Sequence, residues 1–150
     1  MSLISSLIKI FVGDKAKKDM KEIAPLVTQI NAHQAQYKSL TNDQLRAKTT
    51  EFKERIATAR KEYEEKIQSL KAQADTTEDI DQKEDFYTEI DKLTDEAYKA
   101  GEKVLNDILP EAFAVMKETA QRFVDNSTIE VTAAPYDREI ASLKDYVTIE

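Results

Sequence analysis

The sequence predicts a mainly α-helical protein, in which a long antiparallel, coiled-coil-like helical hairpin stands between packed N-terminal and C-terminal helices. The 150-residue chain has only two glycines and three prolines, so few residues interrupt a helix. Charged residues make up 34% of the chain and apolar residues 41%, a composition typical of long helices around a thin core. Apolar residues also recur every three or four positions along two long segments, which is the helical period.

Residues 1–13 predict an amphipathic helix that ends at Gly13. Its apolar run is too short to cross a bilayer, which takes ~20 residues. Two interpretations fit this segment: a helix that lies on an anionic membrane surface, and an ordinary helix docked on its own domain. The residues that would face a membrane are Leu3, Ile4, Leu7, Ile8, Lys9, Phe11, Lys15, Lys17 and Lys18.

Residues 14–125 predict a helical region that contains the hairpin at about 42–108. Pro25 predicts a kink or break near Ala24 in the helix before the hairpin, where Met20, Ile23, Val27 and Ile30 would face inward. Thr41 and Gln44 have the spacing of a capping box at the start of the first arm. Thr76 or Thr77 would cap the second arm. The expected contact residues are Leu45, Thr49, Phe52, Ile56, Ala59, Tyr63, Lys66 and Leu70 in the first arm, and Ile80, Tyr87, Ile90, Thr94, Ala97, Gly101, Val104 and Ile108 in the second.

The two arms differ in charge. Residues 53–71 hold six bases and four acids, whereas residues 75–96 hold ten acids and two lysines. Ion pairs along the flanks would fix the antiparallel orientation more than they would add stability. The excess of acidic residues in the second arm predicts a solvated face of the helix. A calcium site is the alternative interpretation, but no Asp-x-Asp-x-Asp-Gly loop is present. The net charge of −7 excludes a general nucleic-acid binder.

The last third of the chain predicts a new helix and then a change to β structure. Pro110 would stand in the first turn of the helix, with Phe113, Met116, Ala120 and Phe123 on its buried side. Residues 128–132 and 145–149 alternate like strands around a turn at 134–137, which predicts a short β-hairpin at 128–149.

Catalytic, cofactor-binding and metal-binding residues are not expected in this chain. With glycines only at positions 13 and 101, no glycine-rich phosphate loop exists. One histidine and no cysteine exclude cysteine-histidine and zinc-protease sites, and His33 lacks acidic neighbours at helical spacing.

Three stretches together resemble the start of the SecA family, ATP-driven motors that move preproteins through the bacterial SecY channel. The first runs from Leu3 to Gly13, the second is LTNDQLRAKTTEFKERI at 40–56, and the third is LPEAFAVMKETAQR at 109–122. The last spelling is highly specific. The resemblance implies that the chain is the N-terminal fragment of a SecA-type motor.

The resemblance further implies a division of labour. The parent protein would bind ATP and Mg, whereas this chain lacks the ATP site and would be inactive alone. Its first helix would bind the anionic membrane and the channel side, so that the protein is cytoplasmic and peripherally attached to the inner face of the plasma membrane. Residues 40–56 and 109–123, with Phe52, Phe113, Met116 and Phe123, would be scaffold that packs on the nucleotide-binding domain.

Two departures from the family pattern stand out. About 50 residues, 57–106, separate the second block from the third, as a long helical insertion that is either a surface extension or a docking arm. Residues 126–150 would be the truncated start of an inserted β segment before the nucleotide-binding domain. A stand-alone coiled-coil adaptor is the rival interpretation, and a Walker A sequence after Glu150 would decide for the motor. Apolar stripes exposed at 3–12 and 110–124 would favour a homodimer of the isolated chain.

Overall fold

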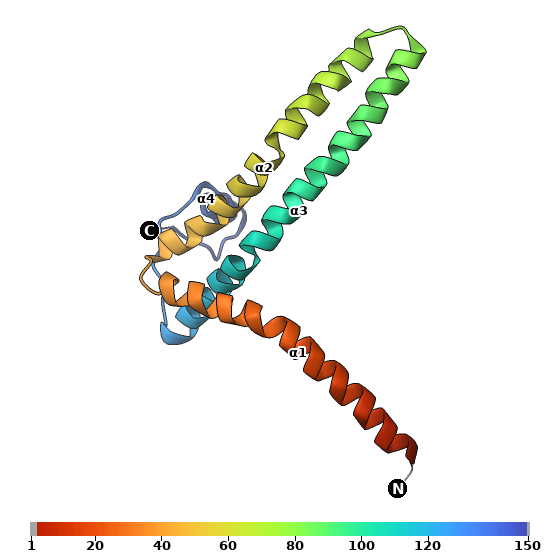
Figure 1. Cartoon of the computed structure of the whole chain (residues 1–150). Coiled ribbons are helices and arrows are strands. Elements are labelled where there is room, and N and C mark those ends of the chain that lie inside the picture. Colours follow the sequence, from red (N-terminus) through yellow and green to blue (C-terminus); the bar gives the residue numbers. More distant parts are fainter. Residues whose placement is uncertain (1–2, 150) are drawn as a thin grey trace.

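The computed structural model describes residues 3–149, with side chains from Lys15 onward. Within this part, the chain forms four helices and no strand: α1 (Leu3–Tyr37), α2 (Asn42–Thr76), α3 (Ile80–Asp125) and α4 (Pro135–Leu143). The prediction of a mainly α-helical protein is confirmed. Figure 1 shows α2 and α3 side by side in opposite directions, with α1 leaving their base in another direction.

Helix α1 is continuous through Gly13 and Pro25, so the predicted end at Gly13 is wrong, and of the two alternatives near Ala24 the break is wrong while the kink agrees with the bend of the helix (Figure 1). An interior glycine costs only ~1 kcal/mol relative to alanine, and a proline removes a single helical hydrogen bond. The axis of α1 bends midway (Figure 1). The Thr28 hydroxyl donates to the Ala24 carbonyl at 3.0 Å, a side-chain contact that often accompanies a bend.

The start of α2 follows its sequence signal. The Gln44 amide donates to Thr41 Oγ1 at 3.2 Å, and the Thr41 amide donates to Gln44 Oε1 at 2.8 Å, so the predicted capping box is confirmed. Asp79, rather than Thr76 or Thr77, caps α3, because its Oδ1 accepts from the amides of Asp81 and Gln82. An aspartate is the stronger cap next to the positive end of a helix.

The contact between α2 and α3 is a narrow apolar seam. Ile67, Ile90 and Leu93 form its distal cluster, with Tyr63 and Leu70 packed against it. The predicted contact residues Lys66, Thr94, Ile80 and Tyr87 are exposed instead. From Tyr63 the seam advances by four residues to Ile67, so Ile67 is buried where Lys66 was expected. On α3, Leu93 is likewise buried in place of its polar neighbour Thr94, because burial of an apolar side chain is favourable.

Pro110 lies inside α3 rather than at a helix start, so the predicted new helix is the continuation of the second arm. No residue before the proline supplies a stop signal, and Ile108, Pro110 and Ala114 are all buried at the base. The side predicted to be buried is exposed: Phe113 by 54%, Met116 by 69% and Phe123 by 67%. Helix α1 packs on another side of α3, which carries Ala114 and Glu118.

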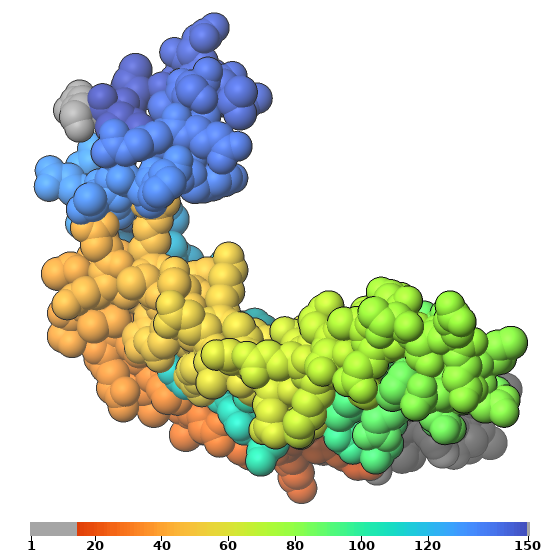
Figure 2. Space-filling view, turned by 90° about the horizontal axis from the view of Figure 1, so that it is seen from above, coloured from red at the N-terminus to blue at the C-terminus, as the bar shows by residue number. Residues whose placement is uncertain are grey.

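The predicted β-hairpin at 128–149 is wrong. Helix α4 covers the expected turn, with Pro135 in its first turn and the Asp137 carboxylate accepting from the Ala134 amide at 2.8 Å. The alternating residues 128–132 are extended, but the Thr132 amide donates to Asp43 rather than to another strand. Figure 2 shows this segment stacked against the first part of α2, away from the turn of the hairpin.

Candidate functional site

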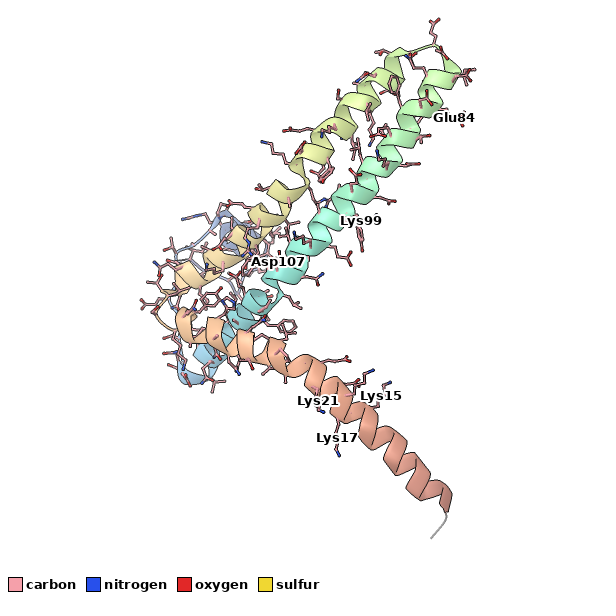
Figure 3. The ribbon with its side chains drawn as sticks, in the orientation of Figure 1. Lys15, Lys17, Lys21, Glu84, Lys99 and Asp107 are labelled. Carbon is pink, nitrogen blue, oxygen red and sulfur yellow. The ribbon has the colours of Figure 1, made fainter. Side chains whose placement is uncertain are left out.

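The first half of α1 carries the candidate membrane-binding residues. Leu3, Ile4, Leu7, Ile8, Lys9 and Phe11 belong to the helix, but their side chains lie outside the described residues. Lys15, Lys17 and Lys18 are exposed. Figure 3 shows Lys15, Lys17 and Lys21 on the part of α1 that projects away from the hairpin, with Lys15 and Lys17 on different sides of the helix.

Exposed apolar side chains continue along α1 past its midpoint. The sequence placed Met20, Ile23 and Val27 on an inner face, but they are exposed by 66%, 49% and 45%. Among these apolar residues only those at the C-terminal end of α1 pack, because Ile30 and Tyr37 contact the core while the helix before them extends past it. An uncovered helix with apolar residues and a surplus of lysine has the chemistry of an interfacial helix on anionic lipid.

A polar junction at the base holds α1 in place, and Arg122 is its centre. The guanidinium donates to the Leu40 carbonyl at 2.8 Å, to the Tyr37 carbonyl at 3.1 Å and to Asn42 Oδ1 at 2.7 Å. It also pairs with Glu118 at 3.0 Å, with both side chains largely buried. Arg122 therefore satisfies the Leu40 carbonyl, adds a second donor to the Tyr37 carbonyl at the end of α1, and joins the three long helices.

A second part of the junction surrounds Glu111. Arg55 donates to one carboxylate oxygen at 2.7 Å, and the Tyr37 hydroxyl donates to the other at 3.1 Å. Burial alone would raise the pKa of Glu111, but the hydrogen bonds from Arg55 and Tyr37 outweigh it and hold that pKa below its usual range. Burial, together with the hydrogen bond to Glu111, raises the pKa of Tyr37. The ionised carboxylate thus ties α1 to α2 and α3.

The segment after α3 is tied to the start of α2. Thr132 donates to both oxygens of Asp43, at 2.8 Å from its amide and 2.6 Å from its hydroxyl. These bonds hold the pKa of Asp43 below its usual range. Arg46 pairs with Asp137 at 2.7 Å. The tail is therefore fixed beside the apolar groove formed by Leu45, Val115 and Phe123 together with Ile129 and Val131.

Sequence reasoning missed the junction. The sequence did not single out Arg122 or Glu111 as contacts between helices. Apart from Glu118, which stands four positions before Arg122, their partners lie 56 to 85 positions away in the chain, so no local spacing could reveal the contacts between helices.

Within the described residues, no group of His, Cys, Asp and Glu could hold a metal ion. The helices described there also include none long and apolar enough to cross a membrane. The candidate site consists of the exposed surface of α1 and the polar junction that holds α1 in place.

Comparison with known proteins assigns the chain. The family model of the SecA DEAD-like domain matches residues 8–141. The protein translocase subunit SecA of Christiangramia forsetii is 55% identical over 150 residues, which is 100% of this chain and 13% of that protein. The same-named protein of Flavobacterium psychrophilum is 48% identical over 149 residues, 99% of this chain and 13% of its own length. No solved structure matches.

These matches also bear on the long hairpin. Because the Christiangramia forsetii protein aligns with all 150 residues, residues 57–106 and 126–150 have counterparts in it. The chain spans about an eighth of the length of these relatives, since it covers 13% of each. The match of the family model to most of the chain, with the identity over its whole length, shows that this chain belongs to the SecA family.

Proposed function

We propose that this chain is the N-terminal part of a SecA-type motor that couples ATP hydrolysis to the movement of preproteins through the SecY channel. The identity of 55% over the whole chain to a protein translocase subunit SecA supports this proposal. ATP and Mg belong to the parent protein, and the chain contributes no residue to their site. A stand-alone adaptor is the weaker candidate, because an adaptor would not be expected to keep this identity to a translocase subunit.

The chain's own role is to dock the motor on the membrane and channel and to provide scaffold helices. The single observation that carries the docking role is the projecting half of α1, where Lys15, Lys17 and Lys18 are exposed beside uncovered apolar side chains. Each lysine near an anionic surface contributes about 1 kcal/mol. The bound protein would sit on the cytoplasmic side, at the inner face of the plasma membrane.

The scaffold role rests on the junction. Arg122 and Glu111 fix α1 against the hairpin through the carbonyl and the hydroxyl of Tyr37, so a membrane contact at one end of α1 has a defined position relative to α2 and α3. The exposed Phe113, Met116 and Phe123 would be covered by the rest of the parent protein. In the isolated chain the same residues would favour a homodimer.

Co-sedimentation with liposomes tests the docking role. Lys15→Gln, Lys17→Gln and Lys18→Gln together should weaken binding to vesicles rich in phosphatidylglycerol by about a hundredfold, from three losses of about 1 kcal/mol each. Binding to phosphatidylcholine vesicles should be weak for every variant. The control changes Lys53, Lys61 and Lys71 of α2 to glutamine, with the same change in net charge, and should bind as the wild type does.

Removal of residues 1–13 is the second arm of this experiment. It should abolish binding to anionic vesicles, because the apolar residues that would enter the membrane are lost. Equal binding by the shortened and full chains would remove α1 from the proposed mechanism.

We also expect calorimetry to show no ATP binding by the isolated chain, and a micromolar dissociation constant would contradict the assignment of the ATP site to the rest of the parent.

A further inference from the structure

The two arms of the hairpin have different outer surfaces. Helix α2 is described throughout, and none of its large apolar side chains is exposed. Helix α3 exposes many: Ile80, Tyr87, Tyr98, Leu105, Leu109, Phe113, Met116, Phe123 and Val124. Scattered exposed apolar residues are normal on a protein surface, but two helices in the same hairpin should then show them alike. The difference indicates that the outer surface of α3 is suited to contact with another molecule rather than to exposure to water.

The distal part of this surface is uncovered by any described element. Ile80, Tyr87, Tyr98 and Leu105 are exposed by 79%, 49%, 69% and 51%. They follow one another at spacings of seven, eleven and seven residues, which places them on one side of a helix. Helix α2 contacts a different side, through Ile90, Leu93 and Ala97, and α1 leaves the base in another direction (Figure 1).

An acid follows three of these apolar residues at a fixed distance. Glu84, Asp91 and Glu102 each stand four positions after Ile80, Tyr87 and Tyr98 in turn, so each pair shares one side of the helix. Figure 3 marks Glu84 near the turn end of α3. We call Ile80, Glu84, Tyr87, Asp91, Tyr98, Glu102 and Leu105 the α3 outer face.

The charges of the α3 outer face are not neutralised within the chain. Glu84, Asp91 and Glu102 are exposed and form no ion pair with any described residue. The helical period puts Lys92 and Lys103 on a different side of α3, whereas Lys83 and Lys99 border the α3 outer face but form no ion pair with its acids within the described residues. On α2, by contrast, acids and bases pair along the helix: Arg60 with Glu64, Lys61 with Glu65 and Lys66 with Glu62.

We propose that the α3 outer face binds a basic amphipathic helix of a partner protein. Apolar side chains in a line along a helix fit the apolar stripe of a second helix laid lengthwise against it. The unpaired acids select lysine and arginine on the flanks of that stripe. The face spans 25 residue steps, about 37 Å at the helical rise, so a partner helix of six to seven turns would fill it. This interaction does not depend on the membrane contact of α1.

The test measures binding of a labelled helical peptide to the full chain by fluorescence anisotropy. The probe is a synthetic 25-residue peptide with leucines along one side and lysines on both flanks, and a matched peptide carries glutamate in place of every lysine. We expect the lysine peptide to bind and the glutamate peptide not to bind. Glu84→Lys with Asp91→Lys should weaken binding by about tenfold or more, and Tyr87→Ser with Tyr98→Ser should weaken it comparably.

The matched control is Asp85→Lys with Glu89→Lys, which makes the same change in net charge on another side of the same helix. It should change the dissociation constant by less than about twofold, and circular dichroism should show that every variant remains helical. Equal weakening by the two charge-reversal variants, or no binding of the lysine peptide, would overturn the proposal. So would light scattering that shows a dimeric wild type and a monomeric Glu84→Lys, Asp91→Lys variant, since a second copy would then occupy the face.

Discussion

The base of the molecule and the distal half of the hairpin are both helical but are held together by different forces. At the base, ion pairs and hydrogen bonds join residues far apart in the chain, such as Arg55 with Glu111 and Arg122 with the carbonyls of Tyr37 and Leu40. In the distal half, every ion pair within the described residues lies three or four positions apart on one helix, as in Lys66 with Glu62. Within the described residues the two arms are joined there by the apolar seam and, at the turn, by the hydrogen bond from the Thr77 hydroxyl to Gln82 Oε1.

This difference gives the two regions different roles: the base fixes the relative positions of the helices, and the distal half extends the hairpin. Polar contacts with many partners define one geometry, because each donor and acceptor must be satisfied when it is buried. A seam of apolar contacts keeps two helices together but tolerates changes on their outer sides. Single polar substitutions at the base should therefore lower the stability of the fold, whereas those on the distal surface should change it very little. The distal surface is then free to vary with its partners.

The largest effect is expected at Arg122. Arg122→Met would leave Glu118 buried without its cation and would remove the donor to the Leu40 carbonyl, whereas the Tyr37 carbonyl would keep its bond from the Leu40 amide. Removing one partner of a buried ion pair costs about 3–5 kcal/mol, which urea unfolding followed by circular dichroism would measure. Arg122→Lys keeps the charge but loses the forked donors, so it should lose less stability. A loss below about 1 kcal/mol for Arg122→Met would mean that the junction does not hold the base.

A smaller effect is expected at Glu111. Glu111→Gln removes the charge from the contacts to Arg55 and Tyr37 and should cost about 1–3 kcal/mol. The wild type should also lose stability on acidification. Because the folded pKa of Glu111 lies below its unfolded value, its contribution is present above the ordinary carboxyl pKa of about 4.3 and is lost as the pH falls through the folded value.

The pH series separates Glu111 from the other carboxylates. The Glu111→Gln variant should show a shallower loss of stability with acid than the wild type when both are unfolded in urea at a series of pH values. Asp43 titrates in the same direction and remains in both proteins, so it cancels in the comparison. Parallel curves for the two proteins would show that Glu111 is not linked to folding.

The smallest effect is expected on the distal surface. Lys66→Gln breaks the pair with Glu62, which spans one turn of α2, and both side chains are more than half exposed. Such pairs contribute about 0.3–0.5 kcal/mol or less, so the melting temperature should stay within the error of the measurement. A loss similar to that of Glu111→Gln would erase the distinction between the base and the distal arm.

Local signals in the sequence predicted local structure. The spacing of Thr41 and Gln44 gave the capping box because both partners stand within one turn. The fold class followed from composition and period for the same reason. The single breakers Gly13 and Pro110 misled the prediction, because the cost of one glycine or proline is smaller than the stabilisation from the helix on either side of it, whereas Pro25 gave the bend that was one of its two predicted outcomes.

Long-range contacts determined the parts of the structure that local sequence signals did not predict. Residues 128–132 alternate like a strand, yet Thr132 finds its partner in Asp43, 89 positions earlier. The side of α3 that carries Phe113 and Met116 was expected to be buried because it is apolar, yet α1 packs beside Glu118, whose charge Arg122 neutralises. The candidate membrane residues were found from the sequence because amphipathicity is local, but the junction that positions them was not.

Hydrogen exchange of the full chain, with and without vesicles of phosphatidylglycerol, tests the central claim most directly. Without vesicles, amides at the base, around Tyr37–Leu45 and Glu111–Arg122, should exchange more slowly than those in the first half of α1. With vesicles, protection should rise in the first half of α1 and stay unchanged at the base and in the hairpin. Protection gained at the base or along α3, with none in α1, would contradict a fixed junction that presents α1 to the membrane.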